Sequence, residues 1–237
     1  TLQALIQANG ITNPSFIYPG QQLLIPGGQP PPGPSPSPPP ASAPPSSNLL
    51  PNPSFEAGYS HLYGAPELQV PSAWHLGLVE GGGAPGTGLT YLRPESRVLP
   101  RWSLPAAEHS LFIWDGDWTV KVFKGSAPMS FRLTTRLRLE PGTYRFHGGY
   151  FSDLVAGYEN GRKVWATQPA AGEVAFVLSG GGSGWRAVIP GAREAVDQTF
   201  TIDAPGEVDI GLAFRTRYPL LNNGFFMDNW SLQRLGP

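Results

Sequence analysis

The sequence has no cysteine in its 237 residues and no charged side chain among the first 55 of them. The absence of cysteine excludes disulfide bonds, thiolate metal sites and a cysteine nucleophile. No apolar run approaches the roughly 18 residues of a membrane-spanning helix, so no membrane span is expected. The net charge of −1, from 16 Lys and Arg against 17 Asp and Glu, argues against nucleic acid as a partner.

Glycine and proline are abundant instead. The chain contains 30 Gly and 28 Pro, which together make 58 residues and are roughly twice the average share. Both residues are unfavourable inside helices, which argues against long helices. Because 40% of the residues are hydrophobic and 11% aromatic, the chain still has enough apolar side chains for a core. The composition predicts a β-rich globular protein with many turns, a proline-rich linker, or both.

Proline is concentrated in residues 27–47, where ten of the 21 residues are Pro. Repeated proline favours an extended polyproline II conformation, and no core forms from this composition. We interpret the segment as a spacer between two domains. The alternative is a docking segment for an aromatic-lined groove.

Residues 1–26 are too few for an independent domain. They contain an expected helix, two turns and a short expected strand, and this order resembles the second half of a LysM domain. The residues that carry the resemblance are Ala8-Asn9-Gly10, Asn13-Pro14, Ile17, Pro19-Gly20-Gln21, Leu23 and Ile25-Pro26. The family folds as βααβ and binds N-acetylglucosamine polymers such as peptidoglycan or chitin. The resemblance implies an association with cell-wall glycan, although the first strand, first helix and first loop of the family are absent.

Residues 48–237 are expected to form one large all-β domain. Several segments alternate apolar and polar residues with a period of two, as half-buried strands do, and turn signals such as Pro141-Gly142 separate them. The expected strands are 110–115, 118–124, 132–139, 144–147, 162–168, 173–178, 185–189, 200–203, 208–215 and 225–233. Short antiparallel strands without helices predict a two-sheet β-sandwich, or jelly roll.

The two ends of this domain carry recognisable motifs. The sequences NLLPNPSFE at 48–56 and FFMDNWSL at 225–232 resemble the opening and closing strands of carbohydrate-binding modules of the galactose-binding-like jelly-roll type. Such modules occur beside xylanases, cellulases and other glycosidases. The resemblance spans the whole domain and implies a module that binds a polysaccharide on its concave face.

The same motifs imply a structural calcium site, because many members of this fold bind calcium where the first and last strands meet. Glu56 and Asp228 are carboxylates at the matching positions. Backbone carbonyls near Asn52 and Ser54 would complete the oxygen shell that calcium requires. The alternative is that Glu56 and Asp228 only cap strands or pair with arginine.

Sugar recognition requires flat aromatic faces beside polar groups that bind hydroxyls. All seven Trp lie in the β-domain; Trp230 is expected in the core, and at least one of Trp114 and Trp118 is expected to be exposed. The alternative for each Trp is a place in the core, and for each Arg a solvated surface position. The candidate ligand-binding residues are Trp114, Trp118, Arg136, His147, Asp153, Trp165, Arg215, Arg217 and Asn222.

Five arginines follow the polar side of neighbouring expected strands, which makes a ligand-binding face more plausible. They are Arg132, Arg136, Arg138, Arg145 and Arg215. An anionic glycan would suit such a face, although acidic residues elsewhere neutralise the total charge.

Catalytic motifs are absent from the sequence. It has no Gly-x-Ser-x-Gly elbow, no His-Glu-x-x-His and no Walker loop, and its four histidines lack metal-ligand spacing. We therefore expect a non-catalytic glycan-binding protein, secreted or at the cell surface. The alternative is a structural or interaction subunit of a cell-surface assembly, in which the β-domain and the linker bind other surface proteins.

Overall fold

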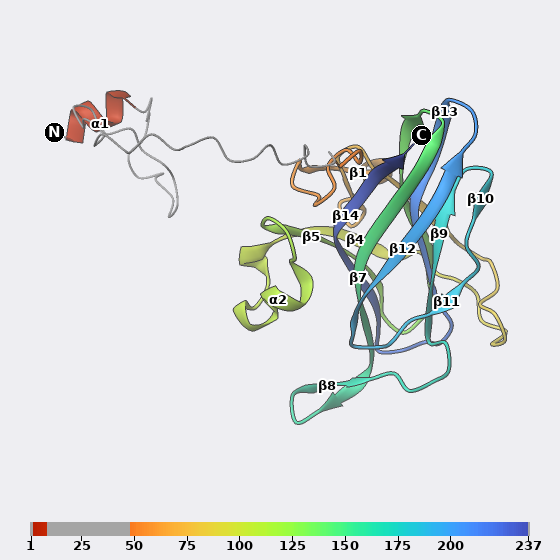
Figure 1. Cartoon of the computed structure of the whole chain (residues 1–237). Coiled ribbons are helices and arrows are strands. Elements are labelled where there is room, and N and C mark those ends of the chain that lie inside the picture. The colour runs from red at the N-terminus through yellow and green to blue at the C-terminus, as the bar shows by residue number, and fades with distance from the viewer. Residues whose placement is uncertain (1, 9–47, 237) are drawn as a thin grey trace, which may run out of the picture. The chain divides into compact units, whose positions relative to one another are not determined.

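The computed structural model describes residues 2–8 and 48–236 (Figure 1). The chain divides into two units, Thr1–Ala43 and Pro44–Pro237. In the first unit, helix α1 spans Leu2–Ala8, as the sequence predicts. The rest of the LysM-like segment and the predicted spacer, 27–47, lie outside the described residues. Within the described residues, no helix is long and apolar enough to cross a membrane.

The described part of the second unit is built from strands in two antiparallel sheets (Figure 1). Sheet 1 contains β3 (His75–Val79), β6 (Ser130–Leu139), β9 (Gly172–Leu178), β10 (Gly181–Gly182), β11 (Arg186–Ala187) and β13 (Gly206–Thr216). Sheet 2 contains β4 (Glu95–Pro100), β5 (Trp118–Lys124), β7 (Gly142–Glu159), β8 (Arg162–Trp165), β12 (Arg193–Ile202) and β14 (Asn222–Gly236). A separate two-stranded ladder joins β1 (Tyr59–His61) and β2 (Gln69–Pro71).

The strand orders define a two-sheet β-sandwich and confirm the predicted fold class. Sheet 1 runs β10-β9-β13-β6-β3, with β11 also pairing with β9. Sheet 2 runs β12-β7-β14-β5-β4, with β8 also pairing with β7. The chain crosses between the sheets repeatedly, since β6 and β13 lie in one sheet while β7, β12 and β14 lie in the other.

Apolar residues at alternate strand positions fill the space between the sheets. On β6 and β13, Leu133 pairs with Leu212 and Phe131 with Phe214, and all four side chains are buried. Trp230 of β14 is also fully buried, as predicted. Burial of one such side chain stabilises the fold by roughly 1.5–3 kcal/mol. The alternate residues of each strand point away from this core and form the two outer faces of the sandwich.

The start of the β-domain is bound to its last strand. The side-chain oxygen of Asn48 accepts a hydrogen bond from the backbone N–H of Leu232, and the N–H of Trp230 donates to the carbonyl of Pro53. These contacts join residues that are far apart in the sequence, so the segment after residue 48 and the C-terminal strand stabilise each other.

Most of the expected strands are confirmed, although several are shorter or longer than predicted. Residues 118–124 form β5 as expected. The expected strand at 162–168 ends at Trp165, and that at 185–189 is reduced to β11. The strands expected at 144–147 and 225–233 are parts of the longer strands β7 and β14.

The expected strand at 110–115 is wrong, because helix α2 occupies His109–Phe112. Short 3-10 turns lie at Leu62–Gly64, Arg101–Ser103 and Ala106–Glu108. Phe112 stacks on Phe226 with ring centroids 3.7 Å apart and meets Phe151 edge-on. Phe151 and Phe226 lie on the outer side of sheet 2, where water would otherwise reach them. The helical segment covers them, and this long-range packing overrides the local alternation.

Candidate functional site

The outer face of sheet 1 carries a regular grid of side chains. Paired residues of neighbouring strands point to the same side, so the register arranges them in rows across the sheet. Row 1 is Arg136–Asp209, row 2 is His75–Thr134–Gly211–Val177, row 3 is Gly77–Arg132–Ala213–Ala175, and row 4 is Val79–Ser130–Arg215–Glu173. Three intervals of two residues separate row 1 from row 4, which amounts to about 20 Å along the strands.

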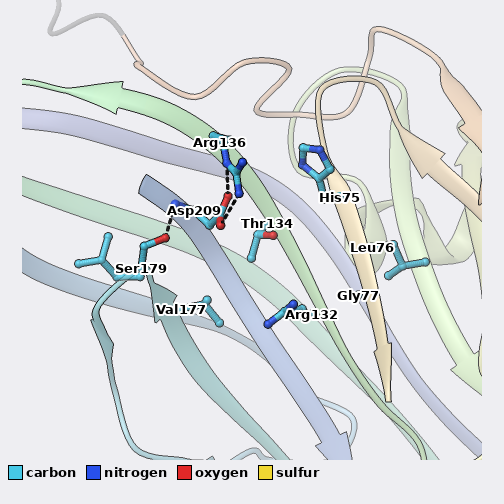
Figure 2. A pocket seen from close by; sticks show the side chains of 10 residues that line it. His75, Leu76, Gly77, Arg132, Thr134, Arg136, Val177, Ser179 and Asp209 are labelled. Carbon is cyan, nitrogen blue, oxygen red and sulfur yellow. Dashed lines mark hydrogen bonds and ion pairs between the residues drawn. The ribbon is translucent and has the colours of Figure 1, made fainter. Parts of the chain in front are cut away.

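A cleft of about 570 Å³ lies over rows 1 to 3. It is lined by His75, Leu76, Gly77, Arg132, Thr134, Arg136, Val177, Leu178, Ser179 and Asp209 (Figure 2). Three of the lining residues are small, Gly77, Thr134 and Ser179. Next to Thr134 in row 2, a Cβ at Gly211 would overlap the backbone carbonyl of Leu133, so glycine is required where β13 approaches β6.

At row 1, the rim of the cleft is formed by an ion pair between Arg136 and Asp209. Two guanidinium nitrogens of Arg136 donate to the two carboxylate oxygens of Asp209 at 2.8 and 2.9 Å (Figure 2). These hydrogen bonds hold the pKa of the Asp209 carboxyl below its ordinary value. The backbone N–H of Asp209 in turn donates to the hydroxyl of Ser179 at 2.7 Å. A bidentate pair with outward-facing donors and acceptors is suited to binding sugar hydroxyls.

Arg132 lines the cleft at row 3, two rows away from the Arg136–Asp209 pair. Its side chain lies across Gly77, where a Cβ would come within 2.7 Å of the Arg132 Nε atom. Arg132 is exposed, and among the described residues no ion pair or hydrogen bond engages its guanidinium group. His75, which is also exposed, lies on the adjacent strand in row 2.

At the other end of the face, the carboxylate of Glu173 is buried between two arginines. Arg215 donates to it at 2.7 Å, and Arg217 donates to both of its oxygens at 3.0 and 2.8 Å. Burial alone would raise the pKa of Glu173, but the two arginines outweigh burial and hold it below its ordinary value. The ring of Trp185 lies against the Arg215 guanidinium, 4.2 Å from ring centroid to Cζ, and 39% of Trp185 is exposed.

Arg136, Arg215 and Arg217 are therefore the candidate ligand-binding residues that the structure brings to sheet 1. His75 and Asp209 line the cleft although the sequence did not single them out as site residues, and so does Arg132, which the sequence placed among the five arginines of a possible ligand-binding face. The alternation of β6 and β13 assigned Arg132 and Asp209 to polar faces, but only the pairing of those strands places both on one cleft.

His147 and Trp114 lie on sheet 2 instead. The His147 ring is 3.2 Å from the carboxylate of Asp197, which also accepts from Arg145 at 2.9 Å. The expectation that Arg145 shares a face with Arg132 is therefore wrong, because β7 joins sheet 2 and β6 joins sheet 1.

The indole of Trp114 is covered rather than offered to solvent. Arg193 lies 4.2 Å from its ring centroid, and the indole also packs against Gly149, where a Cβ would be only 3.0 Å from it. A smaller cleft of about 290 Å³ adjoins these residues and His147. Trp114 is half-buried, so its ring packs against neighbouring residues and has no free face for a sugar.

Asp153 of β7 and Asn222 of β14 belong to one polar cluster on sheet 2. The Asp153 carboxylate, only 2% exposed, accepts from Lys163 at 2.9 Å, from Lys121 at 3.2 Å and from Asn222 at 3.0 Å. Its oxygens are already engaged, which gives the cluster a structural role. Trp165 is half-buried nearby and meets Phe151 edge-on.

Trp118 is also half-buried, so the expectation that Trp114 or Trp118 would be exposed is wrong. Trp102 meets Trp118 edge-on, with ring centroids 5.4 Å apart, and is itself 73% exposed. The exposed indole of this region is thus Trp102, which the sequence gave no reason to prefer.

Glu56 and Asp228 both accept hydrogen bonds from the loop at 114–118. One Glu56 oxygen accepts the backbone N–H groups of Asp117 and Trp118, each at 2.9 Å. Asp228 accepts those of Trp114 at 2.6 Å and Asp115 at 3.1 Å, and also that of Asn229. Burial raises the pKa of Asp228 to about 7, although these three donors favour its ionised form.

These contacts give the two carboxylates a structural role that needs no metal. Calcium needs six to eight oxygens with carboxylates among them, and Glu56 Oε1 and both Asp228 oxygens already accept backbone N–H groups. No group of three or more acidic, His or Cys side chains suited to a metal occurs within 2–8 and 48–236. The alternative of a local structural role agrees with the geometry, and calcium binding stays a prediction.

Comparisons with known proteins follow the same division of the chain. Residues 1–26 match the LysM domain family, which confirms the resemblance seen in the sequence. A search of curated proteins finds no match.

Among solved structures, the chain is similar to several β-sandwich modules. One is the carbohydrate-binding module TmCBM61 in complex with β-1,4-galactotriose, at 18% identity and TM-score 0.46, covering 80% of this chain and 99% of that one. Another is a carbohydrate-binding module of Cellvibrio mixtus lichenase 5A in complex with cellotriose, at 11% identity and TM-score 0.32, covering 66% and 95%. A third is an α-L-arabinofuranosidase, at 10% identity and TM-score 0.40, covering 79% of this chain and 26% of the enzyme. At these TM-scores the similarities do not assign a ligand.

Proposed function

We propose that the β-domain is a non-catalytic polysaccharide-binding module whose binding site is the cleft on the outer face of sheet 1. The observation that carries the proposal is the cleft itself, about 570 Å³ and lined by both polar and apolar side chains, with the Arg136–Asp209 pair at its rim. Rows 1 to 3, over which the cleft lies, extend about 13 Å along the strands, which suits an oligosaccharide better than a single sugar.

The chemistry of the cleft supports a sugar ligand. The Arg136–Asp209 pair offers donors and acceptors at the rim of the cleft. Beyond the cleft, at row 4 of the same face, Trp185 has a partly exposed indole beside Arg215. Hydroxyl hydrogen bonds and apolar contact with an aromatic ring are the two interactions that sugar recognition combines.

The N-terminal segment supports the same class of ligand. Residues 1–26 match the LysM domain family, and we propose that this segment associates with cell-wall glycan. We propose that the protein acts outside the cell, secreted or at the cell surface, where such polymers occur.

The experiment is affinity gel electrophoresis of the full chain in gels containing β-1,4-galactan, xylan, β-glucan, pectin or chitin. Retardation in at least one gel is expected. Thr134→Tyr, which fills the cleft from row 2, should abolish it, while Tyr158→Ala, which removes an exposed aromatic ring at the far end of β7, should not. Normal migration of the wild-type chain in every gel, or retardation that survives Thr134→Tyr, contradicts the proposal.

A second candidate function rests on Trp102. An indole that is 73% exposed and braced by Trp118 lies outside the cleft and would suit contact with another surface protein. Trp102→Ala separates the two functions. Loss of glycan retardation in this variant would move the glycan site to this indole, whereas loss of a surface-protein contact alone would favour the second function.

A further inference from the structure

We infer that the cleft of sheet 1 recognises a carboxylated sugar, a uronic acid, and that Arg132 is the residue that binds its carboxylate. This inference rests on the proposed function and specifies the class of glycan.

The first argument is the charge inside the cleft. Its lining holds two arginines, Arg132 and Arg136, against one carboxylate, Asp209, whereas the whole chain carries a net charge of −1. Asp209 is already engaged in a bidentate pair with Arg136. The positive charge of Arg132 is therefore left for a ligand. A cleft built only for neutral hydroxyls has no need of it.

The second argument is the way Arg132 is held. Gly77 on the adjacent strand leaves open the space through which the Arg132 side chain passes, since a Cβ there would lie within 2.7 Å of Nε and 2.8 Å of Cγ. The guanidinium group thus lies across the sheet within the cleft (Figure 2). A side chain at position 77 would therefore take the space that the Arg132 side chain occupies.

The third argument contrasts Arg132 with the other arginines of this sheet. Arg136 pairs with Asp209, Arg138 with Glu140 at 3.7 Å, and Arg215 and Arg217 with Glu173. Arg186 of β11 has no ion pair, but it donates to the Tyr150 hydroxyl at 3.1 Å and to the Ala195 carbonyl at 3.0 Å. Among the described arginines of sheet 1, Arg132 is therefore the one whose guanidinium group has neither an ion pair nor a hydrogen bond. A planar guanidinium with all its donors available matches a carboxylate in bidentate geometry.

The distance between Arg132 and Arg136 allows one to bind a carboxylate and the other to bind hydroxyl groups. Arg132 and Arg136 are four residues apart on β6, or about 13 Å along the strand. A carboxylate on one sugar would meet Arg132 at row 3, while hydroxyls of a neighbouring sugar would meet the Arg136–Asp209 pair at row 1.

The test compares polymers that differ only in the carboxylate. The full chain is titrated with oligosaccharides of polygalacturonate, alginate and glucuronate-substituted xylan, each as the free acid and as the methyl ester. Neutral β-1,4-galactan and sulfated carrageenan are included. At least one free acid should bind tenfold or more tightly than its ester, and more tightly than carrageenan.

Variants then assign the effect to Arg132. Arg132→Gln should weaken binding of the free acid by about tenfold to a hundredfold, as expected for loss of a charge-assisted bidentate contact. Its effect on the ester should be small. Arg132→Lys should recover part of the affinity because it keeps the charge but not the fork. Gly77→Ala, which displaces the guanidinium without removing it, should also weaken binding. The control Arg138→Gln removes the same charge from the same strand outside the cleft and should change little.

The failures are distinguishable. Equal binding of every free acid and its ester, or binding of neutral galactan alone, overturns the inference while the proposed glycan function stands. If carrageenan binds as tightly as the best free acid, or if Arg138→Gln weakens binding as much as Arg132→Gln, then general charge attraction explains the binding. Either result also overturns the inference. Absence of binding to any glycan contradicts the proposed function itself.

Discussion

Replacement of Glu173 by Gln should destabilise the β-domain at neutral pH. The carboxylate is buried and accepts three hydrogen bonds from Arg215 and Arg217, whose side chains are 19% and 26% exposed. Gln keeps the shape but removes the charge, so two partly buried guanidinium groups lose their counter-ion. Breaking a fully buried pair costs about 3–5 kcal/mol, and the partial exposure of the arginines reduces this to about 2–3 kcal/mol.

The magnitude translates into a measurable shift of the melting temperature. For a domain of this size, 1 kcal/mol corresponds to about 2–4 °C, so Glu173→Gln should lower Tm by roughly 4–12 °C at pH 7. Thermal unfolding followed by tryptophan fluorescence provides the assay. Glu140→Gln is the matched control, because its ion pair with Arg138 is exposed and 3.7 Å long and should contribute at most about 1 kcal/mol.

The pH dependence gives a second, independent check. The pKa of Glu173 is held below its model-compound value of 4.5, so its stabilising effect is present above that value and is lost as the pH falls through the folded-state pKa. The wild type and Glu173→Gln should therefore differ at pH 7, and the difference should shrink as the pH falls below 4.5 and through the folded-state pKa of Glu173. A variant with unchanged Tm at pH 7, or a difference that persists undiminished in acid, would refute this reasoning.

Three further predictions follow from the packing and the loop contacts. Phe112→Ala should destabilise the domain by about 3–5 kcal/mol, because it removes the ring stacked on Phe226, while Leu111→Ala on the exposed side of α2 should cost far less in the same urea titration; equal costs would contradict the packing. Gly211→Ala should lower Tm and speed hydrogen exchange of the backbone amides of β6 and β13. Gly206→Ala, whose Cβ would meet nothing within 4 Å, should do neither. Similar effects of the two variants would contradict the close approach at Gly211. If Asp228 and Glu56 serve only as acceptors for backbone N–H groups, as their contacts indicate, EDTA should leave Tm unchanged; a fall in Tm that calcium restores would instead establish the calcium site that the sequence predicts.

Prediction from the sequence succeeded where a signal is local. Period-two alternation located β5, β6 and β13 and assigned their inward residues, because each strand repeats its own pattern every two residues. It failed at 110–115, where packing of Phe112 on sheet 2 favours a short helix. The sequence of that segment alone does not show which surface it will cover.

The candidate site was harder to predict for the same reason. The sequence predicts Asp153 as a polar ligand-binding residue on the face opposite the core. In the structure its carboxylate instead accepts hydrogen bonds from two lysines and Asn222 in a buried cluster. Trp114 has the aromatic face that sugar binding needs, yet Arg193 covers it. In both cases the partner comes from another part of the chain, and nothing in the neighbouring sequence indicates it.

The sequence by itself determined that the chain is β-rich, that its charged residues all lie after position 55, and that a LysM-like segment precedes a domain of many strands. Only the tertiary structure decided which arginines share a face. Arg132 and Arg145 both alternate correctly with apolar neighbours, but β6 and β7 join different sheets. Hydrogen bonding between distant strands sets that choice, and it places Arg132 in the cleft beside the Arg136–Asp209 pair.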